Sequence, residues 1–286
     1  MIASMTGYGK AILELPEKKV TIELRSLNSK TFDLNTRIPS FYREKELEIR
    51  NLISETVQRG KIDFSMMVEL NPAARTQSLN AELIKNYIEE FKNITPNVSD
   101  SDLLPVVMRM PDVISYKQDD LNEDEWNQIR STIIEAINAL NKFRTDEGAV
   151  LEKHLVLNLN NILHNLELVL PFEIERIETI KERFAKRLEE LKVDVDQNRF
   201  EQELVFYLEK FDITEEKVRL KNHCEYFLKE LSETESNGKK LGFISQEIGR
   251  EINTLGSKSN HSEMQKIVVQ MKDELEKIKE QSLNVL

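Results

Sequence analysis

The sequence predicts an α+β protein, with an N-terminal sheet and helix domain, a long-helix connector and an all-α C-terminal helical domain. Apolar and polar residues alternate over much of the first 70 residues, with one helical segment between the alternating stretches. Helical periodicity follows from residue 80 onwards. A strand, helix and strand order is typical of a helix packed on one face of a sheet. We expect an N-terminal domain over 1–155, a connector over 156–198 and a C-terminal domain over 199–286.

The first domain is predicted from short alternating segments. Val20, Ile22 and Leu24 alternate with polar residues, which indicates a half-buried strand, and a less regular strand is expected over 30–39. Residues 43–57 have the spacing of a helix, which ends near Gly60. Residues 61–70 return to the strand pattern.

The rest of the chain is predicted to be mostly helical. Asn80 is a candidate N-cap, and a helix is expected from about residue 124 to about 170, where Pro171 interrupts it. A second charged helix should reach about residue 191, and 192–198 is the best linker candidate. Three or four amphipathic helices follow. The last has a continuous apolar seam formed by Met264, Ile267, Val268, Met271, Leu275 and Ile278.

Composition limits the class of protein. The chain has 286 residues, of which 40% are hydrophobic and 32% charged, as in soluble proteins with exposed helices. No apolar run approaches the roughly 20 residues of a membrane span. The N-terminus has no secretory-signal pattern, so we expect a cytoplasmic location and no membrane partner. Cys224 is the only cysteine, which excludes an intrachain disulfide and a Cys-rich zinc site.

Charge is unevenly distributed along the chain. The net charge of −11 argues against a general polyanion binder. Residues 1–80 nevertheless contain 12 Lys and Arg against 10 Asp and Glu, whereas the remainder contains 28 against 41. A local basic surface in the N-terminal part therefore stays compatible with nucleic-acid binding.

Two C-terminal segments place ionisable groups beside an apolar stripe. In the first, Asp212, Glu216, Arg219 and His223 fall on one stripe of a helix that borders its buried face. A stripe in this position tends to face a neighbouring helix or a crevice.

The second segment, 246–260, repeats this arrangement. Glu247 and Glu251 lie beside the stripe of Ile244, Ile248 and Ile252, with Arg250 nearby. If the two helices pack by their apolar faces, their acidic groups can converge.

Such a convergence would suit a divalent cation. Paired carboxylates with one histidine are ligands for Mg²⁺ or Mn²⁺, and the candidate ligands are Asp212, Glu216, Glu247 and Glu251. Candidate phosphate contacts nearby are Arg219, Arg250, Lys240 and Lys258. The same pattern is also typical of a structural ion-pair network, and both interpretations stand.

The N-terminal strands and turns carry further polar and basic residues that can track a phosphate backbone. These are Arg25, Asn28, Lys30, Arg37, Arg59 and Lys61. Ordinary solvated strand charges are the alternative interpretation.

Several motifs, taken in order along the chain, resemble the YicC/YloC family of bacterial endoribonucleases. The N-terminal half contains SMTGYG, ELRSLNSKTFDLNTRIP and RGKIDF. The C-terminal half contains DITEEKVRLKNH, GKKLGFISQEIGREINTLGSKS and ELEKIKEQSLNV. The resemblance covers nearly the whole chain and includes the residues singled out above.

The resemblance implies a cytoplasmic, divalent-metal-dependent endoribonuclease that acts on bacterial small RNAs. It also implies a homohexamer, built mainly by the N-terminal parts around a channel. The chain departs from the family pattern at Ser29 and Lys30, where the family often has His and Arg. Gly242 and Gly249 replace positions that are often polar.

The sequence is compatible with two main functional hypotheses and a third, weaker one. In the first, the chain cleaves RNA, with His223, Glu247, Glu251 and Arg250 as catalytic residues. In the second, it is a non-catalytic RNA-binding or adaptor protein whose C-terminal polar clusters are structural. A helical oligomerisation scaffold without an RNA role is a third possibility.

Overall fold

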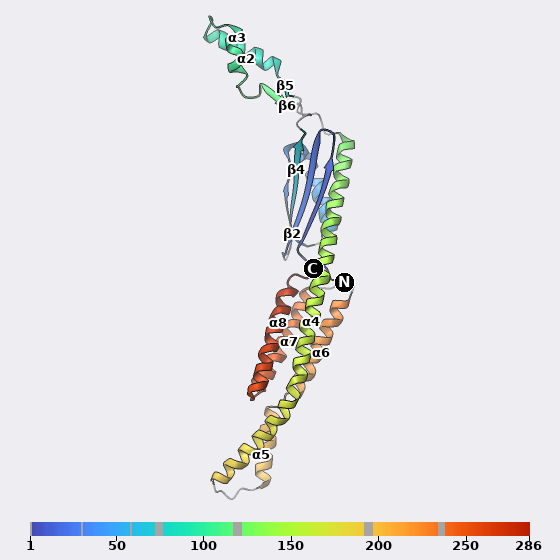
Figure 1. The fold of residues 1–286 in the computed structure, drawn as a ribbon, viewed down its shortest axis with the longest axis vertical. Helices are drawn as coiled ribbons and strands as arrows, with labels where there is room; N and C mark the ends of the chain where they lie inside the picture. Colours follow the sequence, from blue (N-terminus) through green and yellow to red (C-terminus); the bar gives the residue numbers. More distant parts are fainter. Residues whose placement is uncertain are drawn as a thin grey trace.

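The computed structural model describes residues 2–29, 31–57, 59–71, 77–116, 122–191, 197–233 and 238–286. The molecule is elongated, with a sheet in the upper half and a helical bundle in the lower half (Figure 1). Sheet and bundle share the long helix α4 (Glu123–Leu191), which runs past both. The predicted α+β class is confirmed.

The central sheet contains β1 (Gly7–Glu14), β2 (Lys18–Leu27), β4 (Gly60–Leu70) and β3 (Phe32–Arg37), in that spatial order. Its pairs are antiparallel except for β3 with β4, which are parallel. Parallel neighbours need a crossover connection. The 3-10 helix η1 (Ser40–Lys45) and α1 (Glu46–Thr56) supply it.

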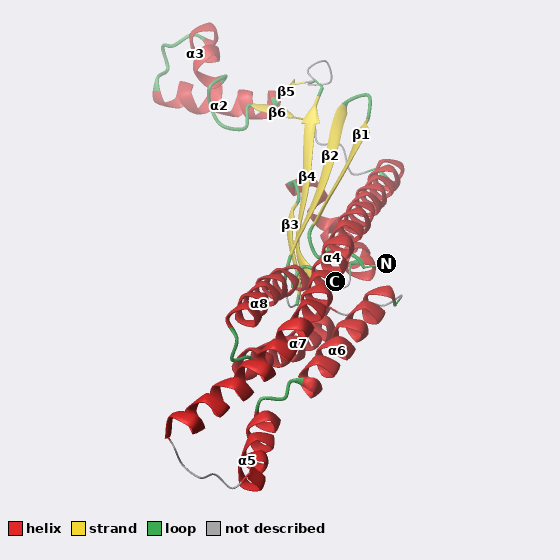
Figure 2. Ribbon diagram, turned by 60° about the horizontal axis from the view of Figure 1, so that its bottom comes forward, coloured by secondary structure: helices red, strands yellow, loops and turns green. Residues whose placement is uncertain are grey.

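One face of the sheet is buried under α1 and the first part of α4, which lies along the strands (Figure 2). The alternation at Val20, Ile22 and Leu24 predicted this, since all three side chains are fully buried. Strand β1 meets α4 very closely. A Cβ atom on Gly9 would lie 2.1 Å from the carbonyl oxygen of Ala136, so only glycine permits this approach.

A small unit projects beyond the sheet, formed by β5 (Gln77–Leu79), α2 (Ala81–Ile94), α3 (Asp100–Val107) and β6 (Ile114–Tyr116) (Figure 1). Asn80 caps α2, as predicted, by accepting a hydrogen bond from the backbone amide of Leu83 at 3.1 Å. The antiparallel pair β5 and β6 was not predicted. Strands of three residues are too short to show an alternation.

Helix α4 continues through Pro171, so the predicted interruption is wrong. Proline removes one backbone hydrogen bond from a helix interior. Tertiary packing on both sides of this position compensates, because Val169 and Ile180 are buried among the helices of the lower half. The predicted domain boundary between residues 155 and 156 falls inside this continuous helix. The domain division remains a prediction.

The lower half consists of the second part of α4 with α5 (Gln197–Lys210), α6 (Thr214–Ser232), α7 (Gly238–Lys258) and α8 (Ser262–Ser282). All six seam residues predicted for the last helix are buried. None of the helices within the described ranges is both long and apolar enough to cross a membrane.

The two halves also meet through the ends of the chain. Ser4 and Val285 form an isolated antiparallel bridge, and the backbone amide of Met5 donates to the carbonyl of Asn284 at 2.8 Å. Arg144 of α4 is buried behind this contact. Its Nη2 atom donates to the carbonyl oxygen of Met5, to Ser26 Oγ and to the carbonyl oxygen of Arg59. One guanidinium thus ties α4 to three separate segments.

We predict that Gly9→Ala lowers the free energy of unfolding by at least about 2 kcal/mol, because a methyl group would overlap the α4 backbone. Gly242→Ala is the matched control, since a Cβ there meets nothing within 4 Å. Because alanine favours a helix more than glycine does, the free energy of unfolding of the control should rise by up to about 1 kcal/mol. Urea denaturation measures both, and equal stability of the two variants would contradict the packing described.

Candidate functional site at the α6–α7 seam

Helices α6 and α7 form an antiparallel hairpin with an ion pair near each end. Lys258 Nζ lies 2.8 Å from Glu216 Oε1, and Lys240 Nζ lies 2.7 Å from Glu230 Oε2. Both carboxylates are buried, with side chains 8% and 4% exposed. Lys240 and Lys258 are about five helical turns apart and therefore lie on one face of α7. The two pairs together fix the register of the hairpin.

We call the facing polar stripes of the two helices the α6–α7 seam. It contains Glu216, His223 and Glu230 of α6, and Lys240, Glu247, Glu251 and Lys258 of α7.

The register places His223 opposite Glu247 and Glu251. His223 is halfway between Glu216 and Glu230, and residue 249 is halfway between the two lysines. Glu247 and Glu251 each lie about 3 Å along the axis from that level, on the face that the lysines share. Gly249 itself faces α8, since a Cβ there would lie 3.0 Å from Leu275 Cδ2.

The same register separates the four predicted metal ligands. Glu251 lies roughly 10 Å along α7 from Lys258, the partner of Glu216, and Glu247 lies roughly 16 Å from it. Within the described ranges, no three or more His, Cys, Asp or Glu side chains are grouped so that they can hold a metal ion. One chain therefore does not bring Asp212 and Glu216 together with Glu247 and Glu251 in a single four-carboxylate cluster.

Glu251 has an unusual environment at the centre of the seam. The residue is only 6% exposed, and no hydrogen bond or ion pair involves its side chain among the described residues. The carboxylate oxygens of Glu251 are not among the fully buried unpartnered atoms of the described residues, so they keep some contact with solvent, where water or a ligand can reach them. Glu247 is half-exposed, with its Oε2 3.9 Å from Arg250 Nη1. His223 is half-buried.

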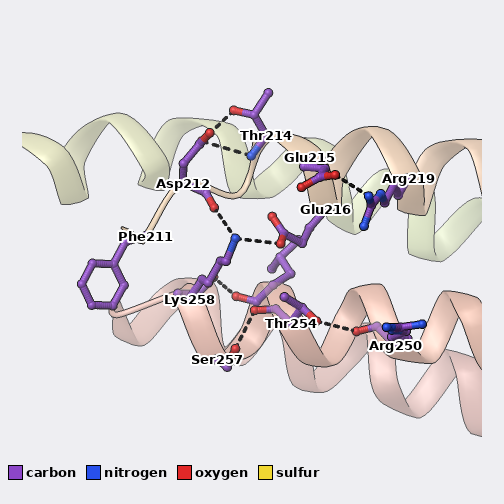
Figure 3. A network of polar contacts seen from close by, with 12 residues as sticks. Phe211, Asp212, Thr214, Glu215, Glu216, Arg219, Arg250, Thr254, Ser257 and Lys258 are labelled. Carbon is purple, nitrogen blue, oxygen red and sulfur yellow. Dashed lines mark hydrogen bonds and ion pairs between the residues drawn. The ribbon is translucent and has the colours of Figure 1, made fainter. Parts of the chain in front are cut away.

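Figure 3 shows the end of the seam near Asp212, where the Lys258 side chain lies between α6 and α7. Its Nζ atom donates to the backbone carbonyl of Asp212 at 2.9 Å as well as contacting Glu216 Oε1. The second oxygen of Glu216, Oε2, is buried and has no hydrogen-bond partner. Lys258, predicted as an RNA contact, is thus engaged within the protein.

The Asp212 carboxylate caps the start of α6 and does not face Lys258 (Figure 3). Its Oδ1 accepts hydrogen bonds from Thr214 Oγ1 at 2.7 Å and from the Thr214 backbone amide at 3.1 Å. The Thr214 hydroxyl is the main reason why the pKa of Asp212 is below its usual value. Arg219 is exposed and pairs with Glu215, one turn away on the same helix.

Arg176 of α4 completes this end of the seam and was missed by the sequence analysis. It is 4% exposed, and its Nη1 and Nη2 atoms donate to the backbone carbonyls of Lys258 and Phe211. Burial lowers its pKa. Arg176 was missed because the many charged residues around it are typical of a solvent-exposed helix. Its helical spacing from Val169 and Ile180, which places it on the buried stripe of α4, could have revealed it.

One end of the seam and its centre contain donors of the type that Mg²⁺ and Mn²⁺ prefer. Near Asp212, Glu216 Oε1 and the backbone carbonyl of Asp212 contact the Lys258 ammonium, and the other carboxylate oxygen, Glu216 Oε2, is buried without a partner. At the centre, Glu251 lies at the level of His223 along the hairpin. Each place offers oxygen donors of the type that a divalent cation takes, but not a ready-made set of three metal-ligating side chains among the described residues.

The predicted RNA contacts of the N-terminal part divide into two groups. Arg25 and Arg37 line a shallow pocket of about 300 Å³ on the outer face of the sheet, with Glu23, Asp63 and Ser65. Lys61 is exposed on the same face of β4. These three residues therefore share one solvent-facing surface.

The other three do not join that surface. Asn28 Nδ2 donates to the carbonyl of Leu283 at 2.6 Å, which fastens the C-terminus to the turn after β2. Arg59 Nε donates to the carbonyl of Ser29 at 3.1 Å. Lys30 lies outside the described residues.

Comparison with known proteins decides the family. The family model described as "Endoribonuclease YicC-like, N-terminal region" matches residues 2–153, and "Endoribonuclease YicC-like, C-terminal" matches residues 171–286.

The chain belongs to the YicC-like endoribonuclease family.

Two curated relatives have the same name, "Probable endoribonuclease YicC". The protein of Clostridioides difficile (strain 630) is 31% identical over 293 aligned residues, which cover all of both chains. The protein of Haemophilus influenzae (strain ATCC 51907 / DSM 11121 / KW20 / Rd) is 27% identical over 287, again with complete coverage. The YicC-like C-terminal match contains the whole α6–α7 seam and Arg176, whereas the N-terminal match contains the sheet and Arg144.

We predict that Asp212→Asn lowers stability at neutral pH and that the deficit disappears in acid. The lowered pKa of Asp212 means that its charged form stabilises the folded YicC-like chain above the unfolded-state pKa. This contribution is lost as the pH falls through the folded-state pKa. Urea denaturation between about pH 5 and pH 2 measures the convergence of the two proteins. Glu225→Gln controls for the loss of one negative charge from α6, and a constant deficit at every pH would contradict the capping role.

Proposed function

We propose that this chain is an endoribonuclease that cleaves RNA phosphodiester bonds at the centre of the α6–α7 seam with the help of Mg²⁺ or Mn²⁺. The observation that carries the proposal is the position of Glu251, a residue only 6% exposed that has no ion pair among the described residues and lies at the level of His223 along the seam. Membership of a family described as endoribonucleases and the names of its two full-length relatives support the reaction class.

In this proposal the side chains around His223 divide the work of phosphodiester cleavage. An oxygen of water or of a ribose 2′-hydroxyl attacks phosphorus, and the bond to the leaving oxygen breaks. Histidine is suited to proton transfer near neutral pH, so His223 takes the proton of the attacking oxygen or supplies one to the leaving oxygen. Glu251, beside it, stabilises the protonated imidazole.

The neighbouring groups bind and orient the strand. Glu247 and Arg250 lie at the surface above Glu251, where the guanidinium of Arg250 can bind a phosphate oxygen. The exposed Arg219 can do the same from α6. Glu247 and Glu251 would hold the divalent cation, which would supply charge neutralisation and an activated water when bound.

The proposal also includes a path that RNA follows over the protein surface and the assembly of several copies of the chain. Arg25, Arg37 and Lys61 on the outer sheet face would guide the phosphate backbone. Self-association is supported by exposed apolar side chains along α4 such as Phe143, Val150 and Leu157. A hexamer around a channel belongs to the same proposal. A cytoplasmic location and bacterial small RNAs as substrates belong to the same proposal.

The second candidate function is a non-catalytic RNA-binding or adaptor protein. The ion pairs of Glu216 with Lys258 and of Glu230 with Lys240 favour it, because they hold the hairpin together in the way that structural ion pairs do. In that case, the polar groups of the seam stabilise helix packing, and RNA is bound without turnover.

We predict that Glu247→Gln/Glu251→Gln reduces RNA cleavage by at least about 100-fold, as expected when a proton-transfer site is disabled. Its melting temperature should be maintained, because Glu251 has no ion-pair partner to lose and the exposed pair of Glu247 with Arg250 contributes little to stability. Cleavage of a labelled RNA is measured with Mn²⁺ and with EDTA, and EDTA should abolish it.

The matched control is Glu276→Gln/Glu280→Gln, which makes the same change at the same spacing on the exposed face of α8. Undiminished cleavage by the seam double variant would remove these residues from the mechanism. RNA binding without turnover by the wild type, together with a lower melting temperature of the seam variant, would favour the adaptor function.

We predict that Arg25→Gln/Arg37→Gln weakens RNA binding and reduces the slope of log affinity against log salt by about two, one for each lost phosphate contact. Fluorescence anisotropy in EDTA measures binding without cleavage. The control is Arg43→Gln, which removes an exposed positive charge from η1. An unchanged salt slope would exclude the outer sheet face from the RNA path.

A further inference from the structure

The pocket on the outer face of the sheet exists because one small side chain is surrounded by larger ones. Ser65 of β4 lies opposite Glu23 of β2 on one side and opposite Arg37 of β3 on the other. Asp63 and Met67, two residues before and after Ser65, extend from the same face of β4. Ser65 therefore forms the floor of the pocket of about 300 Å³, and these larger side chains stand around it.

Asp63 is the group of this pocket that does not suit a phosphate. Its Oδ1 atom accepts a hydrogen bond from Asn35 Nδ2 at 3.0 Å, whereas Oδ2 makes no hydrogen bond or ion pair among the described residues. A carboxylate has about four acceptor positions, so most of those on Asp63 are open to a ligand. A negative phosphate would be repelled here, whereas a neutral group that carries N–H donors would be bound.

The second carboxylate of the pocket is already compensated. Glu23 Oε1 lies 3.2 Å from Lys10 Nζ, and Glu23 Oε2 lies 3.4 Å from Arg25 Nη2. The hydrogen bond with Lys10 is the main reason why the pKa of Glu23 is below its usual value. Of the two acidic groups that line the pocket, Asp63 is thus the one available to a ligand.

The two arginines of the pocket lie at its rim. The Arg25 side chain is 66% exposed, and its guanidinium carbon lies 5.7 Å from the centre of the Tyr8 ring. Arg37 is exposed and makes no hydrogen bond or ion pair among the described residues. Arginine stems are apolar, so they can cover a flat ring while the guanidinium groups reach phosphates on either side. The pocket therefore suits a base, and its rim suits the backbone that carries the base.

Among the RNA bases, guanine matches an open carboxylate best. Its Watson–Crick edge presents two adjacent donors, N1–H and N2–H, which one carboxylate can accept together. Adenine, cytosine and uracil each present a single donor group beside acceptors on that edge. Ser65 Oγ, which has no hydrogen-bond partner among the described residues, provides one more polar contact at the floor.

We propose that this pocket binds an unpaired guanine of the RNA strand, with Asp63 accepting hydrogen bonds from N1–H and N2–H. The strand is recognised in single-stranded form, because base pairing occupies the same donors. The pocket adds a base preference to a surface whose arginines contact any phosphate backbone. The inference rests on the proposed function in taking RNA as the ligand, but base preference and cleavage are separate properties of the chain.

The test measures the binding of single-stranded uridine oligonucleotides of about ten residues by fluorescence anisotropy in EDTA. One central position is uridine, adenosine, guanosine or inosine, which is guanosine without the N2 amino group. The wild type should bind the guanosine oligonucleotide about tenfold more tightly than the uridine or adenosine one, as expected for one bidentate base contact. Inosine should lose most of this advantage, because it retains only one of the two donors.

Asp63→Asn should reduce the guanosine preference to less than about twofold, because an amide group sets a donor against the donors of guanine. Glu69→Gln is the matched control, since Glu69 extends from the same face of β4 beyond the pocket. The control also removes one negative charge and should keep the full preference. Ser65→Ile fills the pocket with a residue that favours strands, so it should abolish the preference as well. It is the second variant if Asp63→Asn does not fold.

Equal affinity of the wild type for all four oligonucleotides would overturn the proposal, as would a preference that Asp63→Asn and Glu69→Gln retain alike. Cleavage of a labelled RNA is measured on the same proteins. Cleavage without a guanosine preference in binding would remove the guanine pocket and leave the proposed nuclease intact. A preference that depends on Asp63, in a chain that does not cleave RNA, would support the pocket and contradict the nuclease.

Discussion

The register of α6 against α7 is the constraint on which the arrangement of the candidate site depends. It is fixed at one end by Glu216 with Lys258 and at the other by Glu230 with Lys240. A slip of one helical turn would separate both pairs and leave two buried carboxylates without a cation, at a cost of several kcal/mol. The polar residues between the two pairs therefore have defined levels along the seam, and Glu251 lies at the level of His223.

Two buried arginines of α4 stabilise the molecule in a way that complements these ion pairs. Arg144 and Arg176 both donate to backbone carbonyls of segments far away in the sequence. A guanidinium presents several donors in a rigid plane, so one side chain can fix the position of two or three segments. Helix α4 thus organises the sheet with Arg144 and the α6–α7 seam with Arg176.

Much of the fold could be predicted because local patterns encode it. Alternation at Val20, Ile22 and Leu24 identified the central strand, and the seam of the last helix was recognised from its 3/4 spacing. Pro171 misled the prediction because its local cost is visible in the sequence, whereas the packing of α4 that compensates it is not. The short strands β5 and β6 were missed since three residues carry no periodic signal.

The sequence by itself determined the α+β class, the motifs of the family and the side chains that border each buried helix face. Helical periodicity gives the angle of a residue around its own axis, and it therefore placed Glu216 and His223 on one stripe of α6 and Glu247 and Glu251 on one stripe of α7. It contains no information about how far one helix is displaced along another. Only the tertiary structure, through contacts such as that of Lys258 with Glu216, decided which of these groups meet.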